Sequence, residues 1–184
     1  MLVHRTVKSW WVASIVTGAV CIGVQGPSAS MAAMTLTSSA LKAGGSLPKQ
    51  YTCDGANESP PLAWSDVPTG ANTYVLIVED PDAPSGTWVH WVVYDMPLSL
   101  KELPAGVPPS DQLAQGGMQG TNDFHKLGYG GPCPPPGKSH RYVFTLYAVT
   151  QASKIKPNAT KADVLKAIEG HVIGQAELSA TYKR

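Results

Sequence analysis

The 184 residues of this chain suffice for one domain with a hydrophobic core. A hydrophobic content of 43% and a charged content of 15% exclude an intrinsically disordered protein. The formal net charge of +1 excludes a broad basic surface, so we expect no nucleic-acid partner.

Residues 1–30 have the pattern of a secretory signal peptide. Arg5 and Lys8 precede an apolar run over 10–24, and small residues follow at 28–30. A membrane anchor is the alternative, but the run is shorter than the roughly 20 residues that a membrane span needs. We therefore expect cleavage near Ser30, a mature chain without a stable membrane span, and a periplasmic or secreted location.

Four later segments predict β-strands, at 73–78, 88–95, 140–149 and 172–182. The first is apolar throughout, which is typical of a strand buried on both faces. The last alternates small or apolar residues with polar ones, which indicates one buried face and one wet face. In the second segment, strict alternation predicts one face with Trp88, His90, Val92 and Tyr94, and an opposite face with Val89, Trp91 and Val93.

One short helix is predicted between the third and the fourth of these strands. Thr160 and Asp163 resemble a capping pair, an apolar stripe follows them, and Gly170 ends the helix. The stretch 95–129 is rich in Pro, Gly and Ser, which predicts a long loop. We expect a single, mostly β domain over 34–184, a sandwich or Greek key with one short helix.

Two segments near the predicted strands carry side chains suited to binding or catalysis. Asp80 and Asp82 flank a proline directly after the first strand, although Asp and Pro are also common in ordinary turns. His90 lies beside Trp88 in an otherwise hydrophobic strand, where a hydrogen-bonded core histidine is the alternative. Each signal is weak when taken alone.

A third segment, 130–142, ends in a histidine and a tyrosine. His140 and Tyr142 point the same way from the start of a strand, directly after a run of prolines. If the three segments converge, the two histidines form a small pocket for an anion. Aromatic rings and stiff prolines surround this pocket, and the backbone N–H groups of Gly130 and Gly131 add hydrogen-bond donors.

Two of the three cysteines, Cys53 and Cys133, remain after removal of residues 1–30. An even pair in an exported domain indicates a disulfide, and two free buried thiols are the alternative.

Four motifs in order resemble the phosphatidylethanolamine-binding protein family, also called the Raf-kinase-inhibitor-like family, in its bacterial branch. They are YTCDGANESPPLAW at 51–64, EDPDAP at 79–84, TWVHWVVYDMP at 87–97 and GYGGPCPPPGKSHRYVFTLYA at 128–148. The resemblance implies a β-sandwich-like Greek key with a small anion-binding cavity at one end. It implies ligand-binding roles for Asp80, Asp82, Trp88, His90, Gly131, Pro132, Pro134, Pro135, His140 and Tyr142.

We therefore expect a binding protein for a small anionic ligand, such as phosphate, a phospholipid head group or a nucleotide. One alternative is a protein-interaction module, such as a protease inhibitor or an envelope regulator, with 98–124 as its contact surface. Another is a metal-assisted hydrolase that uses Asp80, Asp82, His90 and His140. The sequence has no common nucleophile or metal motif, so we expect no enzymatic activity, no cofactor and no bound metal.

Overall fold

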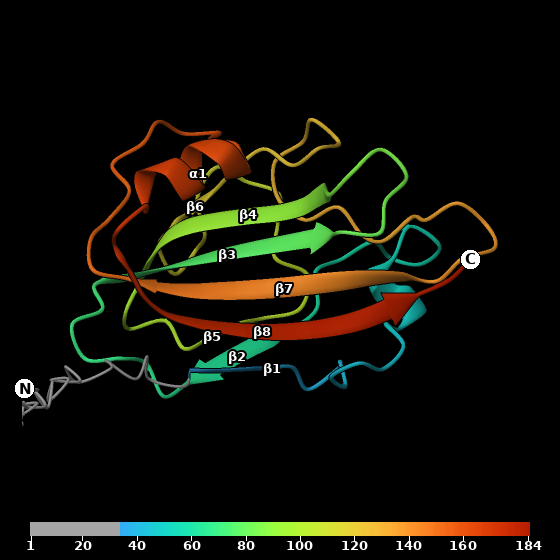
Figure 1. The fold of residues 1–184 in the computed structure, drawn as a ribbon, viewed down its shortest axis with the longest axis horizontal. Coiled ribbons are helices and arrows are strands. Elements are labelled where there is room, and N and C mark those ends of the chain that lie inside the picture. Colours follow the sequence, from blue (N-terminus) through green and yellow to red (C-terminus); the bar gives the residue numbers. More distant parts are fainter. Residues whose placement is uncertain (1–33) are drawn as a thin grey trace, which may run out of the picture. The chain divides into compact units, whose positions relative to one another are not determined.

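The computed structural model describes residues 34–184. These residues form a domain of two antiparallel β-sheets (Figure 1). The larger sheet has the strand order β6-β4-β3-β7-β8. Its strands are β3 (Thr73–Asp80), β4 (Trp88–Pro97), β6 (Met118–Gln119), β7 (His140–Val149) and β8 (Val172–Tyr182). The smaller sheet has the order β1-β2-β5 and consists of β1 (Thr35–Thr37), β2 (Leu62–Ser65) and β5 (Glu102–Leu103). The mostly β fold is thus confirmed.

The main hydrophobic core lies between the two sheets. Leu36, Leu62 and Leu103 contribute from the smaller sheet, and Leu76 and Phe144 from the larger one. β3 occupies the centre of the larger sheet between β4 and β7, and both of its faces are buried, with Leu76 in the main core and Val75 and Ile77 in a second core. This position explains why its sequence is apolar almost throughout.

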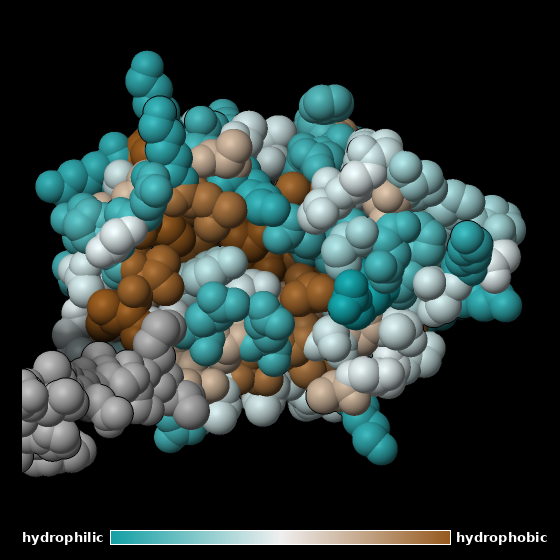
Figure 2. All heavy atoms as spheres, viewed as in Figure 1, coloured by the Kyte–Doolittle hydropathy of each residue, from teal (hydrophilic) through white to brown (hydrophobic). Residues whose placement is uncertain are grey.

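A second, smaller core lies under the short helix α1 (Lys161–Ala167). The predicted capping box is present: Asp163 N–H donates to the Thr160 side chain, and the Asp163 carboxylate accepts from Thr160 N–H. Val164 and Ile168 are buried against outward residues of β3 and β4. Hydrophobic residues gather beside the helix and across the middle of this face (Figure 2).

The predicted alternation along β4 is wrong at its beginning. Trp91 pairs with Val78 and Val89 pairs with Glu79, so His90 is an extra residue on β4, which is a β-bulge. Val89 consequently packs in the second core with Val92 and Tyr94, instead of sharing a face with Trp91. The bulge lets His90 face Tyr142, whose ring belongs to the main core.

The stretch 95–129 is more ordered than the predicted loop. It contains β5 and β6, and it is anchored by the fully buried side chain of Gln119. The amide of Gln119 accepts a hydrogen bond from Trp91 Nε1 at 2.8 Å and donates to the carbonyls of Pro108 and Ser110. One buried amide thus ties the turn at 108–110 to β4 of the sheet.

The signal-peptide prediction falls on residues that lie outside the described part of the chain. It therefore stays a prediction, as do the cleavage site and the location. Within residues 34–184, no helix is long and apolar enough to cross a membrane.

Candidate functional site

A small cavity lies at the end of the larger sheet where β3 ends and where β4 and β7 begin. Its volume is about 200 Å³. It is lined by Asp80, Ala83, Pro84, Ser85, Trp88, His90, Phe124, Cys133, Pro134, Pro135, His140 and Tyr142. The antiparallel pairing of these strands brings together the three segments that the sequence singled out. We call this space the anion cavity, after the anion pocket that the sequence predicts.

Asp80 and His140 form a buried pair inside the anion cavity. The Asp80 Oδ2 atom lies 2.7 Å from His140 Nδ1, and both side chains are almost fully buried. A carboxylate is an acceptor, so Nδ1 of His140 carries the proton and donates it in this bond. Asp80 Oδ1 accepts a second bond, from the N–H of Asp82 at 2.9 Å. The carboxylate therefore fixes the orientation of the His140 ring, and Nε2 is the nitrogen that this bond leaves free.

His90 is held by the backbone of Gly130. Its Nδ1 hydrogen-bonds to the Gly130 carbonyl, and the Gly130 N–H donates to the His90 carbonyl at 2.9 Å. Because a carbonyl only accepts, Nδ1 of His90 carries a proton. Burial lowers the pKa of His90, and the bond to Gly130 and the charges of Asp80 and Asp123 oppose this shift only in part. His90 therefore favours its neutral form, whose Nε2 is an acceptor.

Two hydrogen-bond donors at the anion cavity have no partner among the described residues. They are the indole Nε1 of Trp88 and the hydroxyl of Tyr142, and both atoms are buried. Burial raises the pKa of Tyr142, and the charge and closeness of the Asp80 carboxylate raise it further, so the hydroxyl keeps its proton. The hydroxyl and this carboxylate do not meet the geometry of a hydrogen bond. Buried polar groups are nearly always paired, so these two donors call for an acceptor that residues 34–184 do not supply.

Three predicted site residues lie at the edge of the cavity without lining it. Asp82 is exposed and accepts from the backbone N–H of Arg141 at 2.8 Å, so it fixes the start of β7. Gly131 N–H donates to Asn57 Oδ1 at 2.8 Å, and the Pro132 carbonyl accepts from Cys53 N–H at 3.1 Å. Their contacts position the segment that carries Pro134 and Pro135, which do line the cavity.

Phe124 is the main lining residue that sequence reasoning missed. Its ring packs edge-on against Trp88 and His90, with centroids 5.5 Å and 5.3 Å away. The buried Asn122 builds the turn that presents this ring, because its Oδ1 accepts from the N–H groups of Phe124 and Lys126. An Asn two residues before an aromatic residue was the available signal, but it is common in turns.

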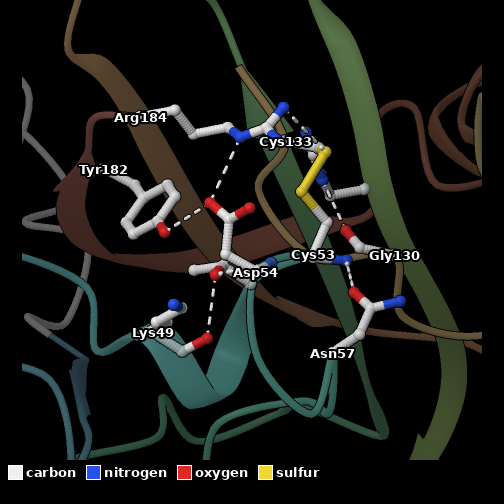
Figure 3. Close-up of a disulfide and its surroundings, with 11 residues drawn as sticks. Lys49, Cys53, Asp54, Asn57, Gly130, Cys133, Tyr182 and Arg184 are labelled. Atoms are coloured by element: carbon white, nitrogen blue, oxygen red, sulfur yellow. Dashed lines mark hydrogen bonds and ion pairs between the residues drawn. A yellow bond between two sulfur atoms is a disulfide. The ribbon is translucent and has the colours of Figure 1, made fainter. Parts of the chain in front are cut away.

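Cys53 and Cys133 are joined by a disulfide, as the sequence predicted (Figure 3). Beside it, Asp54 binds Arg184 Nε at 3.2 Å and accepts from the Tyr182 hydroxyl at 2.8 Å. The disulfide joins the segment after the 3-10 helix η1 (Lys49–Tyr51) to the segment that carries Pro134 and Pro135.

A larger cavity of about 550 Å³ adjoins the anion cavity. Phe124 and Cys133 line both cavities. The remaining lining of the larger one includes Val107, Pro108, Pro109, Leu127 and Tyr129. Its surface is therefore mostly apolar.

Within residues 34–184, no group of three or more His, Cys, Asp or Glu side chains is arranged to hold a metal ion. Asp80 and His140 satisfy one another, and Asp82 is directed to Arg141.

Comparison with known proteins agrees with this fold. A family profile described as phosphatidylethanolamine-binding protein matches residues 37–183. A UPF0098 protein of Methanothermobacter thermautotrophicus is 48% identical over 151 residues, which cover 82% of this chain and 99% of that protein. A UPF0098 protein of Aquifex aeolicus is 45% identical over 159 residues, which cover 85% of this chain and 92% of the relative.

Two solved structures share the fold. A phosphatidylethanolamine-binding protein homologue from Chlamydia trachomatis has a TM-score of 0.76 and 42% identity, and the match covers 83% of this chain and 98% of that one. E. coli YbcL, described as a new member of the mammalian PEBP family, has a TM-score of 0.77 and 35% identity, with 83% and 99% covered. This chain belongs to the phosphatidylethanolamine-binding protein family.

Proposed function

We propose that the protein binds a small oxyanion, such as the phosphoryl group of phosphate or of a phospholipid head group, in the anion cavity. The observation that carries the proposal is the pair of buried, unpartnered donors, Trp88 Nε1 and the Tyr142 hydroxyl. Each donor needs an acceptor, and phosphoryl oxygens are strong acceptors.

The size of the cavity supports a ligand of modest size. A volume of about 200 Å³ is below the range of about 300–1,000 Å³ that is typical of sites for drug-sized ligands. The negative charge of Asp80 is matched by a hydrogen bond from His140. Trp88 and Tyr142 would then donate to one ligand.

We propose binding without catalysis. The sulfur of Cys133 is held in the disulfide and is not a free thiolate. A protein-interaction role for 98–124 remains a separate hypothesis.

Titration calorimetry with phosphorylethanolamine and with inorganic phosphate tests the proposal, and AMP tests the nucleotide variant. We expect Tyr142→Phe to weaken binding by about tenfold or more, since a hydrogen bond to a charged group contributes roughly 1.5–3 kcal/mol. Tyr147→Phe is the matched control, because Tyr147 lies on the same strand and packs against the second core. If none of the three compounds binds the wild type, or if both variants bind equally well, the proposal is wrong.

A further inference from the structure

The Cys53–Cys133 disulfide lies at the boundary between the two cavities. Cys133 lines both the anion cavity and the larger cavity, and Cys53 lines the larger one. Since Phe124 is the other side chain shared with Cys133, the disulfide and this ring together separate a space of about 200 Å³ from one of about 550 Å³.

The disulfide is also the main attachment of the proline wall, by which we mean Pro134 and Pro135. The hydrogen bond from Cys53 N–H to the Pro132 carbonyl lies before this wall, and the bond from Gly137 N–H to the Arg184 carbonyl lies after it. Between them, no backbone hydrogen bond joins 133–136 to another part of residues 34–184, and three of these four residues are prolines without an N–H. Pro134 is buried and Pro135 is exposed, so the position of the wall depends on Cys133 and on the packing of Pro134.

The disulfide is accessible to a reductant. Cys53 and Cys133 are both exposed. The guanidinium Nη1 of Arg184 lies 3.8 Å from the Cys133 sulfur. Figure 3 shows Arg184 beside the disulfide. A cation at this place stabilises a thiolate on Cys133, which makes Cys133 the better leaving group.

We propose that the disulfide is a redox-sensitive control of the anion cavity, so that its reduction by a dithiol releases the proline wall and weakens anion binding. The inference rests on the proposed anion binding. One thiolate of the dithiol attacks Sγ of Cys53, the S–S bond breaks, and its electron pair goes to Cys133. The second thiol then displaces Cys53 and closes the reductant to a disulfide, and both cysteines take up the protons that the dithiol loses.

Anion binding and disulfide formation are thermodynamically linked in this proposal. A disulfide that does not affect the ligand would show no such linkage. If the oxidised protein binds the anion more tightly by some factor, the bound anion shifts the exchange equilibrium toward the disulfide by the same factor. Phosphorylethanolamine should therefore protect the disulfide from dithiothreitol.

The test is an NMR titration with phosphorylethanolamine that follows the ring protons of the histidines in oxidised wild type, in dithiothreitol-reduced wild type and in the Cys53→Ser/Cys133→Ser variant. We expect both forms without the disulfide to bind about tenfold more weakly, because a wall that must be ordered on binding lowers affinity. Asp54→Ala is the control: it removes the polar contacts next to the disulfide and leaves the disulfide in place, so its affinity should equal that of the wild type. Arg184→Gln should slow reduction by about threefold with the oxidised affinity unchanged.

The two proposals fail in distinguishable ways. Equal affinity of folded oxidised and folded reduced protein overturns the redox control and leaves anion binding intact. Absence of binding by the oxidised protein overturns both. If the variant without cysteines does not fold, Pro134→Gly/Pro135→Gly with the disulfide intact carries the same test, since it loosens the wall directly; wild-type affinity in that variant contradicts the proposal.

Discussion

The Tyr142 hydroxyl affects both the stability of the folded protein and the proposed binding of an anion. The side chain is 1% exposed, and its oxygen has no hydrogen-bond partner among the described residues. A buried hydroxyl without a partner costs the free energy of its desolvation, about 1–3 kcal/mol. In the proposed complex the ligand offsets this cost, and without ligand the folded protein bears it.

We therefore expect Tyr142→Phe to raise the free energy of unfolding of the ligand-free protein by about 1 kcal/mol, although it weakens phosphate binding. Urea unfolding without phosphate measures the effect. Tyr147→Phe, on the opposite side of β7, should give no comparable gain. A clear loss of stability in Tyr142→Phe would show that the hydroxyl has a partner within the protein.

His90 predicts a pH dependence of stability. Its pKa in the folded protein lies below the ordinary value of 6.5, chiefly because of burial. In the window between these two values the unfolded chain binds more protons, so the stability contributed by neutral His90 is present above pH 6.5 and is lost as the pH falls toward the folded pKa.

The free energy of unfolding of wild type should thus fall more steeply between pH 7.5 and pH 5 than that of His90→Asn, which keeps a donor for Gly130 and does not titrate. Urea unfolding at several pH values gives the comparison. His125→Asn replaces an exposed histidine at φ 58°, a conformation that Asn tolerates, and should keep the slope of wild type. Parallel curves for wild type and His90→Asn would contradict the role of burial.

At the scale of elements, the Gly130–Gly131 pair sets how closely the proline segment approaches its neighbours. A Cβ on Gly131 would lie 2.6 Å from the Tyr51 carbonyl oxygen and 3.0 Å from Thr52 Cα, which are backbone atoms. A Cβ on Gly130 would meet the ring of Phe124 at 2.6 Å. Phe124 is partly exposed and its ring can move, whereas the backbone at 51–52 cannot yield as cheaply.

We expect Gly131→Ala to lower the free energy of unfolding by about 2–3 kcal/mol, and Gly130→Ala to cost less but to displace Phe124. Thermal unfolding gives the stabilities, and the ring signals of Phe124 and Trp88 report the displacement. An equal loss of unfolding free energy in the two variants would mean that the segment at 130–131 moves away from residues 51–52 instead of clashing with them.

The sequence predicted the long elements well and the short ones poorly. The bounds of β7 and β8 match the predicted segments, because their alternation or apolar character is sustained over ten or more residues. β1, β5 and β6 have only two or three residues each and no periodicity that could indicate them. Their pairing also joins distant parts of the chain, as in Leu36 with Trp64.

The same distinction holds for the site. Asp80, Trp88, His90, His140 and Tyr142 line one cavity, because the antiparallel strand order brings the ends of β3, β4 and β7 together and the bulge in β4 lets His90 face Tyr142. The direction of Asp82 depends on the turn after β3, and the place of Phe124 depends on a turn built by Asn122. Neither turn has a sequence pattern that fixes where its side chains point.

At the scale of the whole domain, the disulfide closes a long loop through the fold. The sequence separation of Cys53 and Cys133 is 80 residues, and the strands β3 and β4 lie between them. A cross-link of this length restricts the unfolded chain, and the chain-entropy account gives a stabilisation of about 4 kcal/mol, with 2–4 kcal/mol typical. Little of this effect depends on the cavity.

The Cys53→Ala/Cys133→Ala variant should therefore lose about 2–4 kcal/mol of unfolding free energy relative to the oxidised wild type, and its urea m-value should rise because the unfolded chain exposes more surface. Reduced wild type should match this variant in both quantities. Since the two sheets bury their core without help from the disulfide, the variant should still unfold in one cooperative transition, followed by tryptophan fluorescence. A variant as stable as the oxidised wild type would mean that native strain at the disulfide cancels its effect on the unfolded chain.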